Sequence, residues 1–168
     1  MSVLGRLIAV ISLSLVFSFQ VQARGNTVYE ETYHIGLLAG TLDGGSEFGS
    51  VEATGFVLSA RNSKAVLEYV NYGSEEGSIL TGGGNWEANI SGIYLSLLGQ
   101  GQPYIKFKVG NLKHEMVTTI SGTTTSETTD FTSYGLGMGY KVGSRLMIEF
   151  DVTSLDNDMT LFALSVLF

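Results

Sequence analysis

The segment SYGLGMGYKVGSRLMIEFDVTSLDNDMTLFALSVLF, residues 133–168, decides the fold. Large apolar side chains alternate there with small or charged ones, and a period of two is the pattern of a β-strand with unlike faces. In its middle run, one face holds Leu146, Ile148, Phe150 and Val152, and the other holds Arg145, Met147, Glu149 and Asp151. The segment therefore predicts consecutive antiparallel strands, the last of which ends at Phe168.

Runs of the same kind recur along the chain, and signals for helices are nearly absent. We predict strands at Tyr29–Gly40, Gly49–Ala60, Ala65–Gly73, Trp86–Leu98, Pro103–Val117, Asp130–Val142, Arg145–Leu155 and Met159–Phe168. Short links (61–64, 99–102, 143–144) alternate with longer ones (41–48, 74–85, 118–129), and only the short link 156–158 breaks the order. This predicts an all-β, up-and-down antiparallel sheet, which about eight strands can close into a barrel without free edges.

The next question is which face of the barrel is inside. A lipocalin-like soluble binder turns its apolar face inward, whereas a transmembrane barrel turns it toward lipid. Here the apolar faces are long and aromatic, the opposite faces hold small residues and isolated charges, and the first strand lacks a Gly-x-Trp motif. We therefore predict a closed transmembrane β-barrel. The faces of the second and fourth strands stay unassigned, because their alternation is poor.

A strand that runs to the last residue fits this prediction. An unpaired backbone group in hydrocarbon costs several kcal/mol. In a closed barrel the last strand pairs with the first, so we expect Phe168 to need no polar tail and to lie at the membrane interface.

The N-terminus has the pattern of a secretory signal peptide. Arg6 precedes the uncharged apolar run Leu7–Phe19, and Val21 and Ala23 occupy the small-residue positions of a cleavage site. The run is shorter than the roughly 20 residues of a membrane-spanning helix, which is the alternative. We predict a signal peptide at residues 1–23 and a barrel domain at residues 24–168.

Composition argues against several classes of function. The chain has 9 Lys and Arg against 16 Asp and Glu, a net charge of -7, so a nucleic-acid partner is not expected. The absence of Cys excludes thiol nucleophiles and thiolate metal sites, and two His residues argue against a multi-histidine metal site. We expect no cofactor and no metal.

Residues 133–168 resemble the C-terminal hairpin of the small Gram-negative outer-membrane barrels of the OmpA/OmpX-like group. The shared pattern is a Gly-alternating strand, a two-residue turn, an acidic strand, a short Asp/Asn link and a final strand ending in Phe. PYIKFKVGNLKHE, residues 103–115, resembles that group's fifth strand. The resemblance implies an outer-membrane protein. It also implies that the assembly machinery reads the terminal signal Phe162, Leu164, Val166 and Phe168.

The predicted inward faces carry a set of charges, namely Glu68, Lys106, Lys108, Lys141, Arg145, Glu149 and Asp151. They could line a narrow channel for ions or small solutes. However, an eight-stranded barrel is only wide enough for its own side chains, and buried charges need partners to offset their desolvation. We therefore expect a paired network that fills the lumen, and the channel remains the alternative.

A lipid A-modifying enzyme is a lower alternative, since some small outer-membrane barrels have that activity. The deacylase type resembles a Ser/His/Glu triad with a His-x-Ser-Asn pattern. Here His114 is followed by Glu115 and Met116, and His34 has no adjacent Ser. Adjacent strand residues point to opposite faces, so His114 and Glu115 cannot form a dyad. We predict no catalytic residue.

The long links are the remaining candidates for function. They are acidic, and could either recruit divalent cations that bridge to lipopolysaccharide or form a solvated surface. Residues 121–129 have the composition of a flexible polar tip. Trp86 could belong to a contact patch, but the enrichment of Trp at membrane interfaces favours the aromatic girdle. We expect an envelope or surface-interaction role, with outer-membrane lipids, lipopolysaccharide and a loop-bound surface partner as candidate partners.

Overall fold

A computed structural model describes residues 31–143, 146–155 and 158–168, and the ordered elements in that part of the chain are all strands. They are β1 (Thr32–Asp43), β2 (Val51–Arg61), β3 (Ala65–Ser74), β4 (Gly77–Ser78), β5 (Asn85–Leu98), β6 (Tyr104–Ile120), β7 (Thr123–Val142), β8 (Leu146–Ser154) and β9 (Thr160–Leu167). All eight predicted strands are present, and the short β4 is an addition. Within the described residues, no helix is long and apolar enough to cross a membrane. The predicted signal peptide lies outside them.

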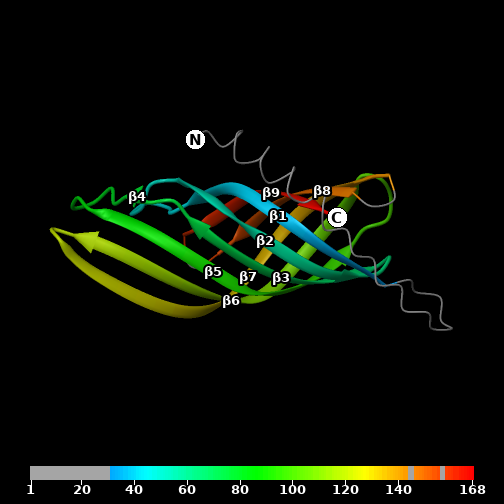
Figure 1. The fold of residues 1–168 in the computed structure, drawn as a ribbon, viewed down its shortest axis with the longest axis horizontal. Helices are drawn as coiled ribbons and strands as arrows, with labels where there is room; N and C mark the ends of the chain where they lie inside the picture. The colour runs from blue at the N-terminus through cyan, green and yellow to red at the C-terminus, as the bar shows by residue number, and fades with distance from the viewer. Residues whose placement is uncertain (1–30, 144–145, 156–157) are drawn as a thin grey trace.

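The eight long strands close into an antiparallel barrel (Figure 1). Strands adjacent in sequence pair with each other, β3 pairs with β5 past the two-residue β4, and β9 pairs with β1. At this seam Phe168 and Ile35 exchange both backbone hydrogen bonds, with N···O distances of 2.9 and 3.2 Å. The predicted closed up-and-down barrel is therefore confirmed, including the pairing of its last strand with its first.

The two ends of the barrel differ. At the end that we name the turn end, β1 begins, β9 ends, and the connections from β2 to β3, from β5 to β6 and from β7 to β8 are made. The opposite end, which we name the loop end, has the connections from β1 to β2, from β3 through β4 to β5 and from β8 to β9, together with the tip of the β6–β7 hairpin. Figure 1 shows this hairpin projecting past the other strands.

The prediction of a long polar loop at residues 118–129 is wrong. β6 and β7 continue to Ile120 and Thr123, which are paired, and only Ser121 and Gly122 form the turn. Their φ values are 51° and 80°, and two positive values are the signature of a type I′ hairpin turn. The segment is polar but rich in threonine, whose β-branched side chain favours a strand. The polar composition of the segment suggests a loop, although its threonines favour a strand.

The outer face of the barrel is apolar over the half nearer the turn end, whereas polar side chains such as Glu87, Lys113 and Glu115 face outward nearer the loop end. Ile105 and Phe107 of β6 are 55% and 56% exposed, while Lys106 between them is 1% exposed. The same alternation holds on β8, where Ile148 and Phe150 face outward and Glu149 is buried. β2 and β5, which the sequence left unassigned, follow the rule and turn outward Phe56, Leu58, Ile93, Leu95 and Leu97. This is the orientation of a transmembrane barrel.

The interior is divided into two parts. Near the loop end it is an apolar core, formed by residues that include Leu42, Val51, Tyr72, Ile90, Leu112 and Leu161. Near the turn end it holds the buried charges described below. The expectation of a lumen filled by small residues and charges is thus incomplete, because large apolar side chains fill the loop-end part.

Trp86 belongs to this apolar core, and its predicted place in a membrane girdle is wrong. The indole is 1% exposed, and its ring centroid lies 5.3 Å from that of Phe48. Trp86 pairs with Gly77 of β4, where an added Cβ would overlap the indole. The glycine therefore makes room for a tryptophan that points into the barrel.

Candidate functional site

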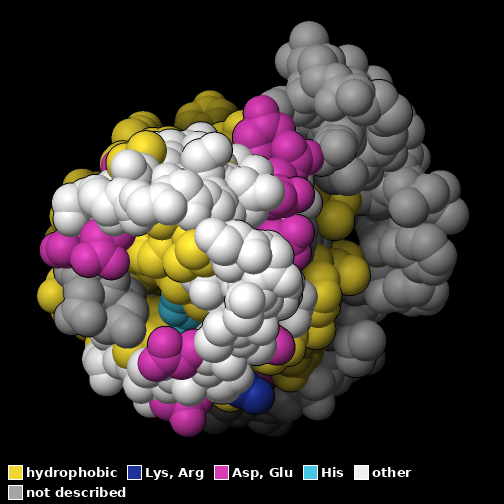
Figure 2. All heavy atoms as spheres, turned by 90° about the vertical axis from the view of Figure 1, so that its left-hand side faces the viewer, with side chains coloured by type: hydrophobic (Ala, Val, Ile, Leu, Met, Phe, Trp, Pro, Cys, Tyr) yellow, Lys and Arg dark blue, Asp and Glu magenta, His cyan; other side chains and the backbone are white. Residues whose placement is uncertain are grey.

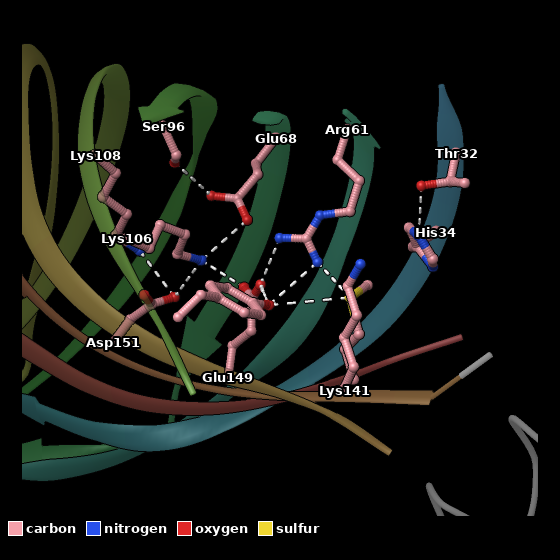
Figure 3. Close-up of polar contacts among 12 residues, drawn as sticks. Thr32, His34, Arg61, Glu68, Ser96, Lys106, Lys108, Lys141, Glu149 and Asp151 are labelled. Atoms are coloured by element: carbon pink, nitrogen blue, oxygen red, sulfur yellow. Dashed lines mark hydrogen bonds and ion pairs between the residues drawn. The ribbon is translucent and has the colours of Figure 1, made fainter. Parts of the chain in front are cut away.

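The candidate site is a cluster of buried ion pairs in the turn-end part of the lumen (Figure 3). Lys106 is at its centre. Its Nζ lies 3.1 Å from Glu68 Oε1, 2.5 Å from Glu149 Oε2 and 3.0 Å from Asp151 Oδ2. These carboxylates come from β3 and β8 and the lysine from β6, so the cluster connects strands that are not neighbours in the sheet.

Two further cations complete the cluster. Arg61 Nη2 lies 2.8 Å from Glu149 Oε1, and Lys108 Nζ lies 3.3 Å from Asp151 Oδ2. Three cations thus face three carboxylates, and the formal charges of these six residues cancel. Mutual pairing offsets the cost of removing such groups from water.

Tyrosines and a serine hold the cluster at its edges. Tyr104 OH hydrogen bonds to Glu149, and Arg61 Nη1 donates to the same hydroxyl at 3.2 Å. Ser96 Oγ donates to Glu68 Oε2 at 3.2 Å, and the ammonium of Lys108 lies 4.6 Å from the ring centroid of Tyr94. The carboxylate oxygens therefore accept neutral as well as charged donors, which fixes their orientation.

Glycines of β7 provide the space for these side chains. β7 lies between β6 and β8, and its inward positions include Gly137 and Gly139. An added Cβ at Gly137 would collide with Asp151, and one at Gly139 with the ring of Tyr104. The glycines that alternate in GLGMG thus leave room in the narrow lumen for bulky polar side chains from both neighbouring strands.

Five of the seven residues proposed from sequence come together in the cluster, namely Glu68, Lys106, Lys108, Glu149 and Asp151. Lys141 is exposed near the turn end of β7, outside the ion pairs among described residues, and Arg145 lies outside the described residues. Sequence reasoning missed Arg61 and Tyr104. Arg61 lies on the same inward face of β2 as Val57 and Ser59, and the sequence pattern predicts it in the turn at residues 61–64.

The cluster is isolated from bulk water. The side chains of Lys106 and Glu149 are both 1% exposed, and apolar side chains fill the lumen toward the loop end. An ion that crossed the barrel would have to break these ion pairs and displace this core. The arrangement is therefore suited to holding the strands together.

The two histidines do not form a catalytic constellation with the residues beside them. The His114 ring faces inward against Phe131, with centroids 6.2 Å apart, while Glu115 faces outward. His34 Nε2 lies 3.0 Å from Thr32 Oγ1 on the same strand. Among the described residues, no three His, Cys, Asp or Glu side chains are placed to hold a metal ion.

The predicted C-terminal signal is an outward-facing row on β9 and the residue after it. Phe162 and Leu164 are exposed, and Val166 and Phe168 are half-buried. The intervening Leu161, Ala163, Ser165 and Leu167 are buried in the barrel. The row is therefore accessible from outside the barrel along its whole length.

Comparison with known proteins gives structural but not sequence matches. No protein-family model matches the chain, and no curated protein matches it in sequence. The N-terminal β-barrel domain of Pseudomonas aeruginosa OprF aligns with a TM-score of 0.60 and 10% identity, covering 80% of this chain and 96% of that one.

Two further solved structures match in the same way. Ail, the attachment invasion locus protein of Yersinia pestis, in complex with the heparin analogue sucrose octasulfate, has a TM-score of 0.57 and 11% identity. The alignment covers 84% of this chain and 97% of the Ail chain. Neisserial surface protein A has a TM-score of 0.54 and 10% identity, with coverage of 82% and 95%.

Identities of this size show the fold alone. The expected resemblance to small outer-membrane barrels is thereby confirmed at that level: this chain has the same closed eight-stranded architecture.

Proposed function

We propose that this chain is an integral protein of the bacterial outer membrane, with a structural or surface-interaction role and no catalytic activity. The observation that carries the proposal is the distribution of side chains across the wall. Outward residues such as Phe107, Leu136 and Phe150 are about half exposed, while Lys106 and Glu149 are buried. An apolar surface of this extent is a liability in water but matches the acyl chains of a bilayer. The likeness in fold to OprF and Ail supports the same location.

We propose further that the lumen does not conduct ions. The charge cluster and the apolar core lie one after the other along the lumen, and their central side chains are almost fully buried. Eight strands enclose a space that side chains can fill. The narrow channel remains the competing function, and a steady conductance would favour it.

The surface role is assigned to the loop end, which we propose faces the outside of the cell. Figure 2 shows Asp and Glu side chains around the rim at this end. The Ail structure contains a bound polyanion. Here the acidic rim disfavours such a ligand, because like charges repel. Contact with lipopolysaccharide phosphates would accordingly need bridging divalent cations.

Two partners in biogenesis and in the membrane complete the proposal. The outward row Phe162, Leu164, Val166 and Phe168 would be read by the outer-membrane assembly machinery, and the apolar wall would contact outer-membrane lipids. The accessibility of this row on β9 supports the first assignment.

Cell fractionation combined with a heat-modifiability gel tests the location. We expect the protein in the outer-membrane fraction, with a compact band in unboiled detergent samples that shifts on boiling. Recovery from the soluble periplasm without detergent would contradict the proposal. Planar-bilayer recording of the purified barrel tests conduction. We expect no steady single-channel steps; steps that Lys106→Ala alters would establish the channel instead.

A further inference from the structure

One strand of the barrel keeps a long free edge at the loop end. β7 pairs with β6 from Thr123 to Gly139. On its other side β7 pairs with β8 only from Tyr134 to Val142. Among the described residues, none pairs with this side of β7 between Thr123 and Ser133. Unpaired strand edges of this kind are templates for a further strand.

The geometry of the hairpin decides which backbone groups this edge presents. A two-residue turn joins Ile120 and Thr123 as a hydrogen-bonded pair, and hydrogen-bonded and non-hydrogen-bonded pairs then alternate along the ladder. The non-hydrogen-bonded residues of β7 direct their N–H and C=O groups toward the free edge. They are Thr124, Ser126, Thr128, Asp130 and Thr132.

A hollow of about 610 Å³ lies beside this edge. Its lining comes from Glu127 and Thr129 of β7, His114 and Met116 of β6, the β1–β2 loop with Glu47 and Phe48, and Asp158 and Met159 before β9. Figure 2, which views the loop end, shows the hollow with apolar side chains in its depth and acidic ones on its rim. A strand added to β7 would direct every second side chain toward this hollow.

The negative charge of the loop end favours a positively charged partner. Glu47, Glu127 and Asp158 line the hollow, and among described residues none of the three takes part in the ion pairs found. Of the described Lys and Arg residues, only Lys113 belongs to the loop-end half, on the outward face of β6. Side chains that enter the hollow therefore meet three carboxylates and the imidazole of His114, with no Lys or Arg among the lining residues.

We propose that the free edge of β7 binds an extended, basic polypeptide segment by strand addition. Lys or Arg residues at alternate positions of that segment enter the acidic hollow. Backbone hydrogen bonds to β7 supply sequence-independent affinity, and the hollow selects side-chain charge. This inference rests on the proposed surface role and names its partner class.

The test uses the folded full-length mature barrel in nanodiscs and a fluorescent nine-residue peptide of alternating Lys and Thr. Fluorescence anisotropy measures the Kd. We expect binding that weakens at high salt, and binding at least about tenfold weaker for the matching Glu/Thr peptide, as like charges disfavour the encounter. Hydrogen exchange should slow at the amides of Ser126, Thr128 and Asp130 when the Lys/Thr peptide binds.

Variants separate the edge from the charge. Thr128→Pro removes an edge-facing N–H while sparing the bonds to β6, since proline is tolerated on edge strands. We expect a loss of affinity of about tenfold or more, whereas Thr128→Val, which keeps the N–H, should change it less than about twofold. Combined Glu47→Gln, Glu127→Gln and Asp158→Asn should remove most of the salt dependence.

Each outcome has a definite meaning. Equal affinity of Thr128→Pro and Thr128→Val would overturn strand addition. Equal binding of the Lys/Thr and Glu/Thr peptides would overturn the charge selection. A heat-modifiability gel on each nanodisc sample establishes that the variant is folded. Because the assay uses purified barrel, its failure is independent of where the protein resides in the cell.

Discussion

Lys106 Nζ and Glu149 Oε2 lie 2.5 Å apart in the barrel lumen, joined across β7, which separates the strands that carry them. Both side chains are almost fully buried. The pair therefore brings β6 and β8 together inside the wall, and Glu68 and Asp151 join the same lysine from either side.

Replacing Lys106 by Met should destabilise the barrel strongly. The change leaves three carboxylates without their shared cation, and removal of one partner from a buried ion pair costs about 3–5 kcal/mol. We expect the free energy of unfolding, measured by urea titration in lipid vesicles, to fall by about that amount.

Lys113→Met is the matched control, because Lys113 lies on the same strand but is exposed on the outer face. Exposed ion pairs contribute about 0–1 kcal/mol, so this variant should unfold close to the native protein. Equal destabilisation by the two changes would show that the lumen cluster has no special role.

A Cβ at Gly139 should disturb the cluster indirectly. It would overlap the ring of Tyr104, whose hydroxyl bonds to Glu149 and Arg61. Overpacking of this kind costs about 1–3 kcal/mol, which we expect for Gly139→Ala in the same urea titration. Gly99→Ala adds its Cβ at ordinary contact distances, so it serves as the control. If both variants unfolded alike, the spatial role assigned to Gly139 would be wrong.

Much of this barrel follows from strict alternation in the sequence. In β8, Ile148 and Phe150 alternate with Glu149 and Asp151, so the orientation of both faces was predictable. In β2, the inward Val57 and Ser59 do not differ clearly in polarity or size from the neighbouring Leu58 and Ala60. The alternation therefore does not show which face is inside, and it does not identify Arg61 as a lumen residue. The register of the closed barrel determines which residues of distant strands come into contact. The pattern within a single strand does not reveal that register.

Trp86 illustrates a second limit. Tryptophan is enriched at membrane interfaces, yet this one occupies an inward position of β5, and Gly77 across from it leaves room for the indole. The polar run at residues 123–130 illustrates a third, because its threonines suit both an exposed strand and a loop. In each case the partner across the ladder decided the structure.

The emission of Trp86, the chain's one tryptophan, should report this burial. We expect blue-shifted fluorescence that neither acrylamide nor brominated lipid quenches, since the indole lies in the apolar interior. Leu97→Trp in a Trp86→Phe background supplies the contrast, because Leu97 is exposed on the outer wall and its replacement should be quenched by brominated lipid. Strong quenching of Trp86 fluorescence by brominated lipid would show instead that the indole lies in the aromatic girdle at the membrane interface.

Phe168 should matter for assembly more than for the folded state. Its backbone bonds to Ile35 survive in Phe168→Ala, while the half-buried aromatic ring at the end of the terminal row is lost. We expect less heat-modifiable protein in the outer membrane of cells, but unchanged refolding of purified protein into detergent. Phe168→Trp should restore assembly. If Phe168→Ala reduced assembly in cells and refolding in detergent equally, Phe168 would contribute to the stability of the folded barrel instead.

The most direct test of the account is methyl NMR of the native barrel in nanodiscs, with contacts detected between leucine methyl groups and lipid acyl chains. Outward leucines, Leu95, Leu97, Leu136 and Leu164, should show strong lipid contacts, and inward ones, Leu42, Leu112 and Leu161, should show none. Lipid contacts at the second group, with the first group silent, would contradict the orientation of the wall and the function proposed from it.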